Sequence, residues 1–133
     1  MYVCYVQINA SYLLTYLLNC RSVKSSIDKV RQLCDSYGII MFQEHWLLPH
    51  ELSMLSRLHP EFLAVSKSAV NIMNGILIGR PYGGNAILYR KYLGNNVTVV
   101  DSSDPRVCAI KLLTNHGPVL FVCVYLPADT GDA

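Results

Sequence analysis

The chain has 133 residues, of which 52% are hydrophobic, and it carries 11 basic residues (lysine and arginine) against 9 acidic residues. A chain of this length holds one domain at most, and its apolar content argues against intrinsic disorder. The formal net charge of +2 excludes a strongly basic surface for tight, non-specific nucleic-acid binding, but it leaves open a cleft in which a metal ion supplies positive charge.

The beginning of the chain admits more than one interpretation. Residues 1–11 form an uncertain leader, whereas residues 12–18 are apolar and predict a buried strand that ends at Asn19. Polar residues such as Gln7 and Asn9 interrupt the first eighteen residues, and this segment lacks the basic region with which a signal peptide begins. We therefore favour a protein without a membrane span, with a small membrane-tethered protein as the alternative.

The next segment predicts a helix between two strands. Ser22 or Ser25 can cap a helix that runs to about Tyr37, and Gly38 is a natural stop. The apolar stripe of this helix consists of Val23, Ile27, Val30 and Cys34. The four apolar residues 39–42 then predict a strand buried on both faces. A β-α-β unit results, with a right-handed crossover if its strands are parallel.

The rest of the chain predicts a second helix and then a series of strands. Pro49 opens that helix, which His59-Pro60 ends, and residues 62–65 form a short strand. Residues 66–84 are rich in Ser, Asn and Gly and predict a long loop. Further strands are expected at residues 85–89, 97–100, 107–113 and 119–125. The expected fold class is therefore α/β, a mixed sheet with outer helices.

Polar side chains follow several of these predicted strands. The second strand leads directly into Gln43-Glu44, and a charge at Glu44 is costly there unless something binds it. Mg²⁺ is one such partner, since it takes one or two carboxylates together with phosphate oxygens. The simpler interpretation is that Glu44 is the first solvated residue. If the strand ends converge, Asn19, Glu44 and Tyr125 bring an amide, a carboxylate and a phenol together, a set that suits phosphate chemistry.

Four blocks in this order resemble the endonuclease/exonuclease/phosphatase family, which includes apurinic endonucleases and deoxyribonuclease I-like enzymes. The blocks are Asn19, the pair Gln43-Glu44, the pair Gly83-Gly84 that opens a strand, and the run 124–127, Val-Tyr-Leu-Pro. The third block is similar in particular to endonuclease domains of LINE-type (non-LTR) retrotransposons. The resemblance extends roughly from Leu13 to Asp129, which is nearly the whole chain.

The resemblance implies a four-layer α/β sandwich, of which this chain supplies about half. It implies DNA nicking by Mg²⁺-dependent phosphodiester hydrolysis, with Mn²⁺ as a possible substitute, in an intracellular protein of the cytoplasm or nucleus. Asn19, Glu44 and Tyr125 take the family's catalytic positions, and Glu44 takes that of the metal ligand. Arg80 and Arg90 are candidate contacts to DNA phosphates, with solvated surface as the alternative role.

The sequence also departs from the family. Some members carry Asp two residues beyond the first Asn, where this chain has Arg21. The family's later Gly-Asp-x-Asn and Ser-Asp-His blocks are absent, so residues 12–133 resemble a truncated, catalytically incomplete domain. An active nuclease with a complementing second half, and a non-catalytic remnant that binds DNA or protein, are the alternatives. We expect the last strand, 119–125, to lie at an open edge and to promote self-association.

Two further expectations concern side chains near these blocks. His45 is expected to support the site from beside it or to lie on the surface, and Trp46 is expected to pack in the core. The five cysteines contain no Cys-x-x-Cys pair, which argues against a zinc ribbon or a thioredoxin motif. Cys20, Cys34, Cys108 and Cys123 stand among apolar residues, as buried reduced thiols do.

Overall fold

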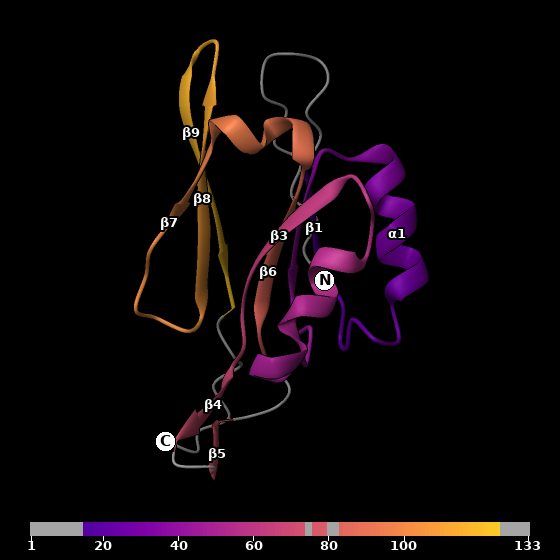
Figure 1. Ribbon diagram of the computed structural model, residues 1–133, viewed down its shortest axis with the longest axis vertical. Coiled ribbons are helices and arrows are strands. Elements are labelled where there is room, and N and C mark those ends of the chain that lie inside the picture. The colour runs from indigo at the N-terminus through magenta and orange to yellow at the C-terminus, as the bar shows by residue number, and fades with distance from the viewer. Residues whose placement is uncertain (1–14, 74–75, 80–82, 126–133) are drawn as a thin grey trace.

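The computed structural model describes residues 15–73, 76–79 and 83–125. Within these ranges the helices, a four-stranded sheet and a three-stranded sheet form successive layers (Figure 1). The expected leader, residues 1–11, and the first residues of the expected first strand, 12–14, lie outside the described residues.

The four-stranded sheet has the strand order β1-β2-β6-β3. These strands are β1 (Thr15–Asn19), β2 (Ile39–Gln43), β6 (Asn85–Arg90) and β3 (Phe62–Lys67). β1 and β2 are parallel, whereas β6 is antiparallel to both β2 and β3. The sheet is therefore mixed, and the parallel β-α-β unit expected from the sequence is confirmed.

Two helices cover one face of this sheet. α1 (Ile27–Ser36) begins later than expected, after Ser26, so Val23 of the predicted stripe precedes the helix. Val30 and Cys34 of the stripe are buried against the sheet. η1 (Pro49–Arg57) begins at the expected proline and is a 3-10 helix. With β1, β2, β3 and β6, these helices enclose an outer core. Its buried members are Leu18, Cys20, Val23, Val30, Cys34, Ile40, Phe42, Leu47, Leu55, Leu58, Phe62, Ala86 and Leu88.

The prediction of a long loop at residues 66–84 was wrong. β3 extends to Lys67, and a hairpin follows that consists of β4 (Val70–Met73) and β5 (Ile76–Gly79). The polar composition of the segment concealed two short apolar runs. The dipeptide Asn74-Gly75 between them is a strong hairpin signal in sequence.

A second sheet packs on the other face of the first (Figure 1). After η2 (Lys91–Asn96), the strands β7 (Val97–Val100), β8 (Val107–Thr114) and β9 (Gly117–Val124) pair antiparallel in this order. The inner core between the two sheets consists of Ile39, Met41, Ile87, Tyr89, Cys108, Ile110, Leu112, Phe121 and Cys123. The strands expected in this part of the sequence are therefore present.

The outward face of the second sheet exposes several large apolar side chains around Lys111, the register partner of Leu120. Leu113 and Leu120 are each 59% exposed, and Val122 is 42% exposed. Exposed large apolar side chains gathered on one face are uncommon on monomeric proteins.

Two further findings concern the described residues. Across residues 15–73, 76–79 and 83–125, no helix is long and apolar enough to cross a bilayer. Cys20, Cys34, Cys108 and Cys123 are all buried free thiols, so the expectation of buried reduced cysteines is confirmed for these four.

Candidate functional site

The polar residues predicted at the strand ends gather at one end of the four-stranded sheet. β1 and β2 finish there at Asn19 and Gln43, which are register partners, and β6 begins there at Asn85, opposite Gln43. We call this end, defined by these three residues, the site end. The opposite end of β6, at Arg90, is the far end.

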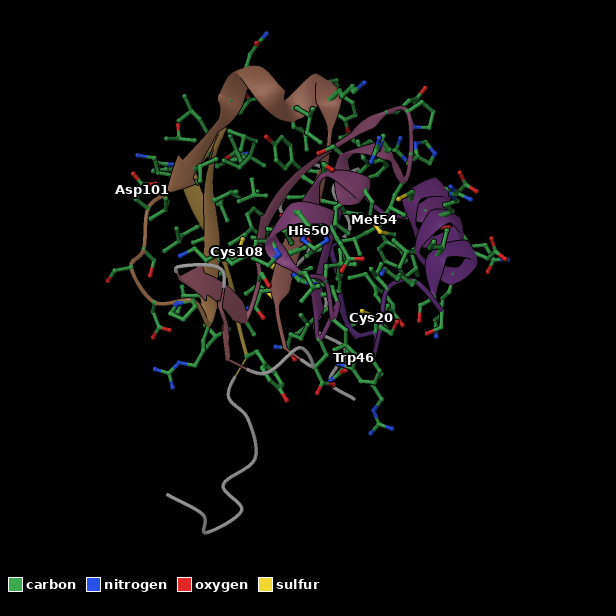
Figure 2. All side chains as sticks on the ribbon, turned by 60° about the horizontal axis from the view of Figure 1, so that its bottom comes forward. Cys20, Trp46, His50, Met54, Asp101 and Cys108 are labelled. Atoms are coloured by element: carbon green, nitrogen blue, oxygen red, sulfur yellow. The ribbon has the colours of Figure 1, made fainter. Side chains whose placement is uncertain are left out.

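The chain continues to pair beyond the strands at the site end. The Cys20 N–H donates to the Gln43 carbonyl at 3.0 Å, and the Trp46 N–H donates to the Gly83 carbonyl at 3.0 Å. Figure 2 labels Cys20 and Trp46 on this part of the molecule. The backbone around Glu44 is therefore tied to both neighbouring segments.

Glu44 and Tyr125 meet at the site end. The Tyr125 hydroxyl donates a hydrogen bond to Glu44 Oε1 at 2.8 Å. The Tyr125 N–H donates to the Arg106 carbonyl at 3.1 Å, which fixes the segment after β9. A carboxylate and a phenol predicted from separate sequence blocks are thus in direct contact.

Asn19 has a side-chain oxygen without a hydrogen-bond partner at the same end. Leu17 packs against the inner core, and because side chains alternate along a strand, Asn19 points to the same side. Its Oδ1 atom is buried and has no hydrogen-bond partner. A buried polar atom without a partner is costly unless a ligand satisfies it, so this oxygen is suited to a cation or to a water molecule held by a cation.

Two amide side chains join the sheets beside the site. Gln43 Nε2 donates to the Val124 carbonyl at 2.5 Å. Asn85, which is 1% exposed, donates from Nδ2 to the Cys123 carbonyl at 3.1 Å and to the Arg106 carbonyl. These bonds set where β9 ends relative to β2 and therefore where Tyr125 begins.

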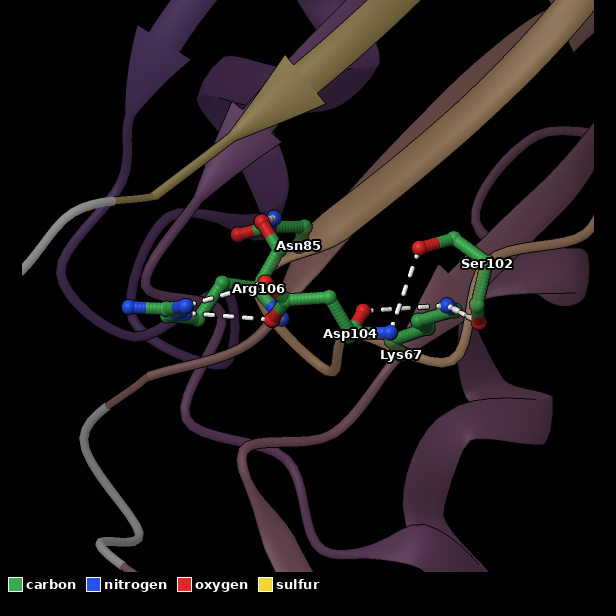
Figure 3. A network of polar contacts seen from close by, with 5 residues as sticks. All are labelled: Lys67, Asn85, Ser102, Asp104 and Arg106. Atoms are coloured by element: carbon green, nitrogen blue, oxygen red, sulfur yellow. Dashed lines mark hydrogen bonds and ion pairs between the residues drawn. The ribbon is translucent and has the colours of Figure 1, made fainter.

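The loop before β8 is held to the same end of the sheet. Figure 3 shows Lys67, which donates to the carbonyls of Ser102 and Asp104, and Arg106, which pairs with the Asp104 carboxylate. The Arg106 guanidinium beside Asp104 lowers the pKa of that carboxyl to about 2. The Arg106 carbonyl, which accepts hydrogen bonds from Asn85 and Tyr125, therefore belongs to a well-anchored loop.

His45 is fully buried, so the expectation that it supports the site from beside it fits the structure, and the surface alternative does not. Its Nδ1 accepts the Leu47 N–H at 2.9 Å, and its Nε2 lies 2.7 Å from the Lys67 carbonyl. Burial lowers the pKa of the imidazole below its ordinary value. The ring is therefore neutral, with its proton on Nε2.

Strained backbone is concentrated at the site end. Four non-glycine residues there adopt the left-handed region: Arg21 (φ 44°), Ser22 (φ 81°), Glu44 (φ 57°) and Trp46 (φ 58°). Each such residue costs roughly 1–3 kcal/mol and persists only where its surroundings enforce it. Strain of this kind is typical of functional sites.

The residues at the site end fit a hard divalent cation with few protein ligands. The described ranges contain no group of three or more His, Cys, Asp or Glu side chains arranged to hold a metal. Mg²⁺ accepts one or two carboxylates and completes its coordination with water and phosphate oxygens. Glu44 and the partnerless Oδ1 of Asn19 match that donor set, whereas a site for zinc would need more nitrogen or sulfur ligands.

Arg90 lies at the far end, away from Glu44. Its Nη2 donates to the Cys34 carbonyl at 2.6 Å, its Nη1 donates to Glu61 at 3.3 Å, and its guanidinium stacks over Phe62. The structure thus gives Arg90 structural partners and does not bring it to the site end. Arg80, the other predicted phosphate contact, lies outside the described residues.

Sequence reasoning missed two basic residues at the site end. Arg21 is exposed directly after Asn19 and Cys20, and the side chain of Arg106 is 54% exposed beside the backbone of Tyr125. Their positions next to two predicted site residues are visible in the sequence, but nothing in the sequence shows that the two segments meet.

Comparison with known proteins supports the fold. No family model and no curated protein matches the sequence. Among solved structures, the chain is similar to AP endonuclease LMAP from Leishmania major, with a TM-score of 0.62 and 13% sequence identity. The similarity covers 86% of this chain and 40% of that chain, so the present chain spans less than half of that endonuclease. The mixed α/β architecture is therefore similar to that of an apurinic endonuclease.

Proposed function

We propose that this chain is part of an endonuclease-like domain related to Mg²⁺-dependent hydrolysis of DNA phosphodiesters. The observation that supports this most strongly is the 2.8 Å contact between Tyr125 and Glu44, with the partnerless Asn19 Oδ1 at the same end of the sheet. The similarity of the fold to an apurinic endonuclease supports the proposal independently.

The side chains have distinct proposed roles. Glu44 would hold the cation, Asn19 would orient a phosphate oxygen or a water molecule, and Tyr125 would orient the Glu44 carboxylate through its hydrogen bond. A bound Mg²⁺, or Mn²⁺ in its place, would neutralise charge on the phosphate. Arg21, being exposed at the site end, is better placed than Arg90 to contact DNA phosphates, and Arg106 is exposed there with its guanidinium paired to Asp104.

We propose that catalysis by this chain alone is incomplete. A water nucleophile needs a general base within hydrogen-bond reach. His45, the histidine at the site end in the described part of the chain, is buried with both ring nitrogens engaged. A second segment that supplies a base would restore the full rate. A non-catalytic DNA-binding remnant is therefore the second candidate function.

We also propose a particular type of endonuclease domain. The Gly83-Gly84 entry to β6 favours an endonuclease domain of a LINE-type retrotransposon in the cytoplasm or nucleus. We further propose that a helical layer covers the exposed face around Leu120 and Val122 in the complete domain, which would then have four layers.

Nicking of supercoiled plasmid tests the proposal. The purified chain is compared with Glu44→Gln in Mg²⁺ and in EDTA, and Glu61→Gln is the matched control because Glu61 pairs with Arg90 at the far end. We expect weak nicking that EDTA abolishes, that Glu44→Gln loses and that Glu61→Gln keeps. Folded protein that binds DNA by fluorescence anisotropy without nicking would support the binding remnant, and protein that does neither would contradict both functions.

A further inference from the structure

The peptide bond between Glu44 and His45 is held on both sides. The Glu44 carbonyl accepts the Ser22 N–H at 2.8 Å and the Cys20 thiol at 3.4 Å. The His45 N–H donates to the Gly84 carbonyl at 3.3 Å. Since Glu44 has φ 57°, a conformation that a glutamate rarely adopts, its direction depends on contacts of this kind.

The His45 side chain anchors the same loop in two further directions. Nδ1 accepts the Leu47 N–H, two residues on, and Nε2 donates to the Lys67 carbonyl at the end of β3. The ring also lies in the space that a side chain at Gly84 would occupy, because a Cβ built there would be 2.1 Å from His45 Cε1. One ring therefore ties the loop after β2 to β3 and to the entry of β6.

From these contacts we infer that His45 is a positioning residue that holds the Glu44 carboxylate in place. It is not a catalytic residue, since it is fully buried and both of its nitrogens are engaged with backbone groups. The positioning of Glu44 follows from the backbone contacts alone. Its consequence for metal affinity rests on the proposed function, in which Glu44 is the metal ligand.

Three substitutions separate the two ring contacts. His45→Asn keeps an acceptor near Nδ1 for the Leu47 N–H and loses the contact with Lys67. His45→Gln places an amide N–H near Nε2 and loses the contact with Leu47. His45→Ala removes both. The matched control is Val30→Ala, because Val30 is a fully buried residue of α1 and of the outer core, and its truncation lowers stability without removing any of the hydrogen bonds that hold the Glu44 loop.

Two measurements on folded protein test the inference. Hydrogen exchange of the backbone amides of residues 22 and 45 reports whether the Glu44 peptide stays fixed, and electron paramagnetic resonance of free Mn²⁺ gives the metal affinity. We expect His45→Ala to speed exchange at these amides beyond the change in global stability and to weaken Mn²⁺ binding about tenfold or more. Val30→Ala should change exchange only through global stability and should keep the Mn²⁺ affinity within about twofold. His45→Asn and His45→Gln should each restore part of the exchange protection and part of the Mn²⁺ affinity that His45→Ala loses.

The outcomes distinguish this inference from the proposed function. Unchanged exchange and affinity in His45→Ala, or equal local effects in Val30→Ala, would overturn the positioning role. If the wild-type chain binds no Mn²⁺, exchange alone decides the inference. Faster local exchange in His45→Ala would then support the role of His45, while the metal assignment at Glu44 would be wrong.

Discussion

The Tyr125 hydroxyl donates to the Glu44 carboxylate at 2.8 Å, although the two residues are 81 positions apart in the chain. The contact joins the end of a central strand of one sheet to the segment that follows the outer strand of the other. The amide side chains of Gln43 and Asn85 donate hydrogen bonds to the last carbonyls of β9 and so fix the position from which Tyr125 reaches Glu44. The candidate site is thus a product of how the two sheets pack.

Removing the Tyr125 hydroxyl tests the value of this contact. Tyr125→Phe leaves the ring in place but removes the donor, so we expect Mn²⁺ affinity and any nicking to fall about tenfold, with a loss of stability of about 1 kcal/mol. Plasmid nicking and Mn²⁺ titration measure the effect. Tyr92→Phe is the control, since Tyr92 is exposed on η2 beyond the far end; equal effects from both substitutions would contradict a role specific to Tyr125.

Gly84 is predicted to be intolerant of any side chain. The residue has φ 100°, and an added Cβ would overlap a His45 ring that two hydrogen bonds hold in place. We expect Gly84→Ala to lower the free energy of unfolding by about 3 kcal/mol. Urea denaturation measures the loss.

A double substitution separates overlap from backbone strain. In a His45→Ala background the overlap disappears, so Gly84→Ala should cost at least about 1 kcal/mol less there than in the wild type. Additive losses in the double-mutant cycle would show that the conformation of residue 84, and not the His45 ring, is responsible.

Much of the fold follows from local patterns, whereas much of the site does not. The apolar spacing that ends at Cys34 predicts α1, although the helix begins only at Ile27, and the run 39–42 predicts β2, because both signals come from neighbouring residues. The burial of His45 is not visible in this way, since its surroundings come from Lys67 and Gly84. The sequence favours Arg90 as a contact to DNA phosphates. Its observed partners, Glu61 and the Cys34 carbonyl, are distant in the sequence and reach Arg90 only in the folded chain.

The buried thiols predict an alkaline limit to stability. Burial raises the pKa of Cys20 and Cys123 to about 12 and that of Cys34 and Cys108 to about 11. A thiol whose pKa is raised on folding favours the folded state below its unfolded pKa of about 9, and this contribution is lost as pH rises from there through the folded value. The free energy of unfolding should therefore fall between about pH 9 and 12.

The measurement is urea denaturation across this range, with Cys123→Ala as the comparison because it removes one titrating group. Its stability should fall less steeply with pH than that of the wild type. The same burial should slow alkylation of these thiols by at least about 100-fold at pH 8 relative to urea-unfolded protein, as peptide mapping would detect. Rapid labelling of Cys20 or Cys123 in folded protein would contradict the burial of these residues.

The outer sheet is predicted to associate with a second copy at β9. In the described part of the chain β9 pairs only with β8, and its outward residues Leu120 and Val122 are exposed. Charged side chains protect such strands from pairing, so Leu120→Lys should remain monomeric where the wild type forms dimers or larger species. Sedimentation velocity over a range of concentrations measures this.

A control for the added charge is available on the same molecule. Tyr92→Lys places a lysine on η2, where the side chain is already 67% exposed, and should leave self-association unchanged. A wild-type chain that sediments as a single monomer at every concentration would contradict the predicted association.

The order of pairing within the first sheet has a consequence for synthesis on the ribosome. β2 pairs with β1, which is made just before it, and with β6, which is made more than 40 residues later. Until β6 and the second sheet have emerged, Ile39 and Met41 have no inner core to enter. The nascent chain therefore carries an uncovered apolar strand for a large part of its translation, a period in which holding chaperones would be expected to bind it.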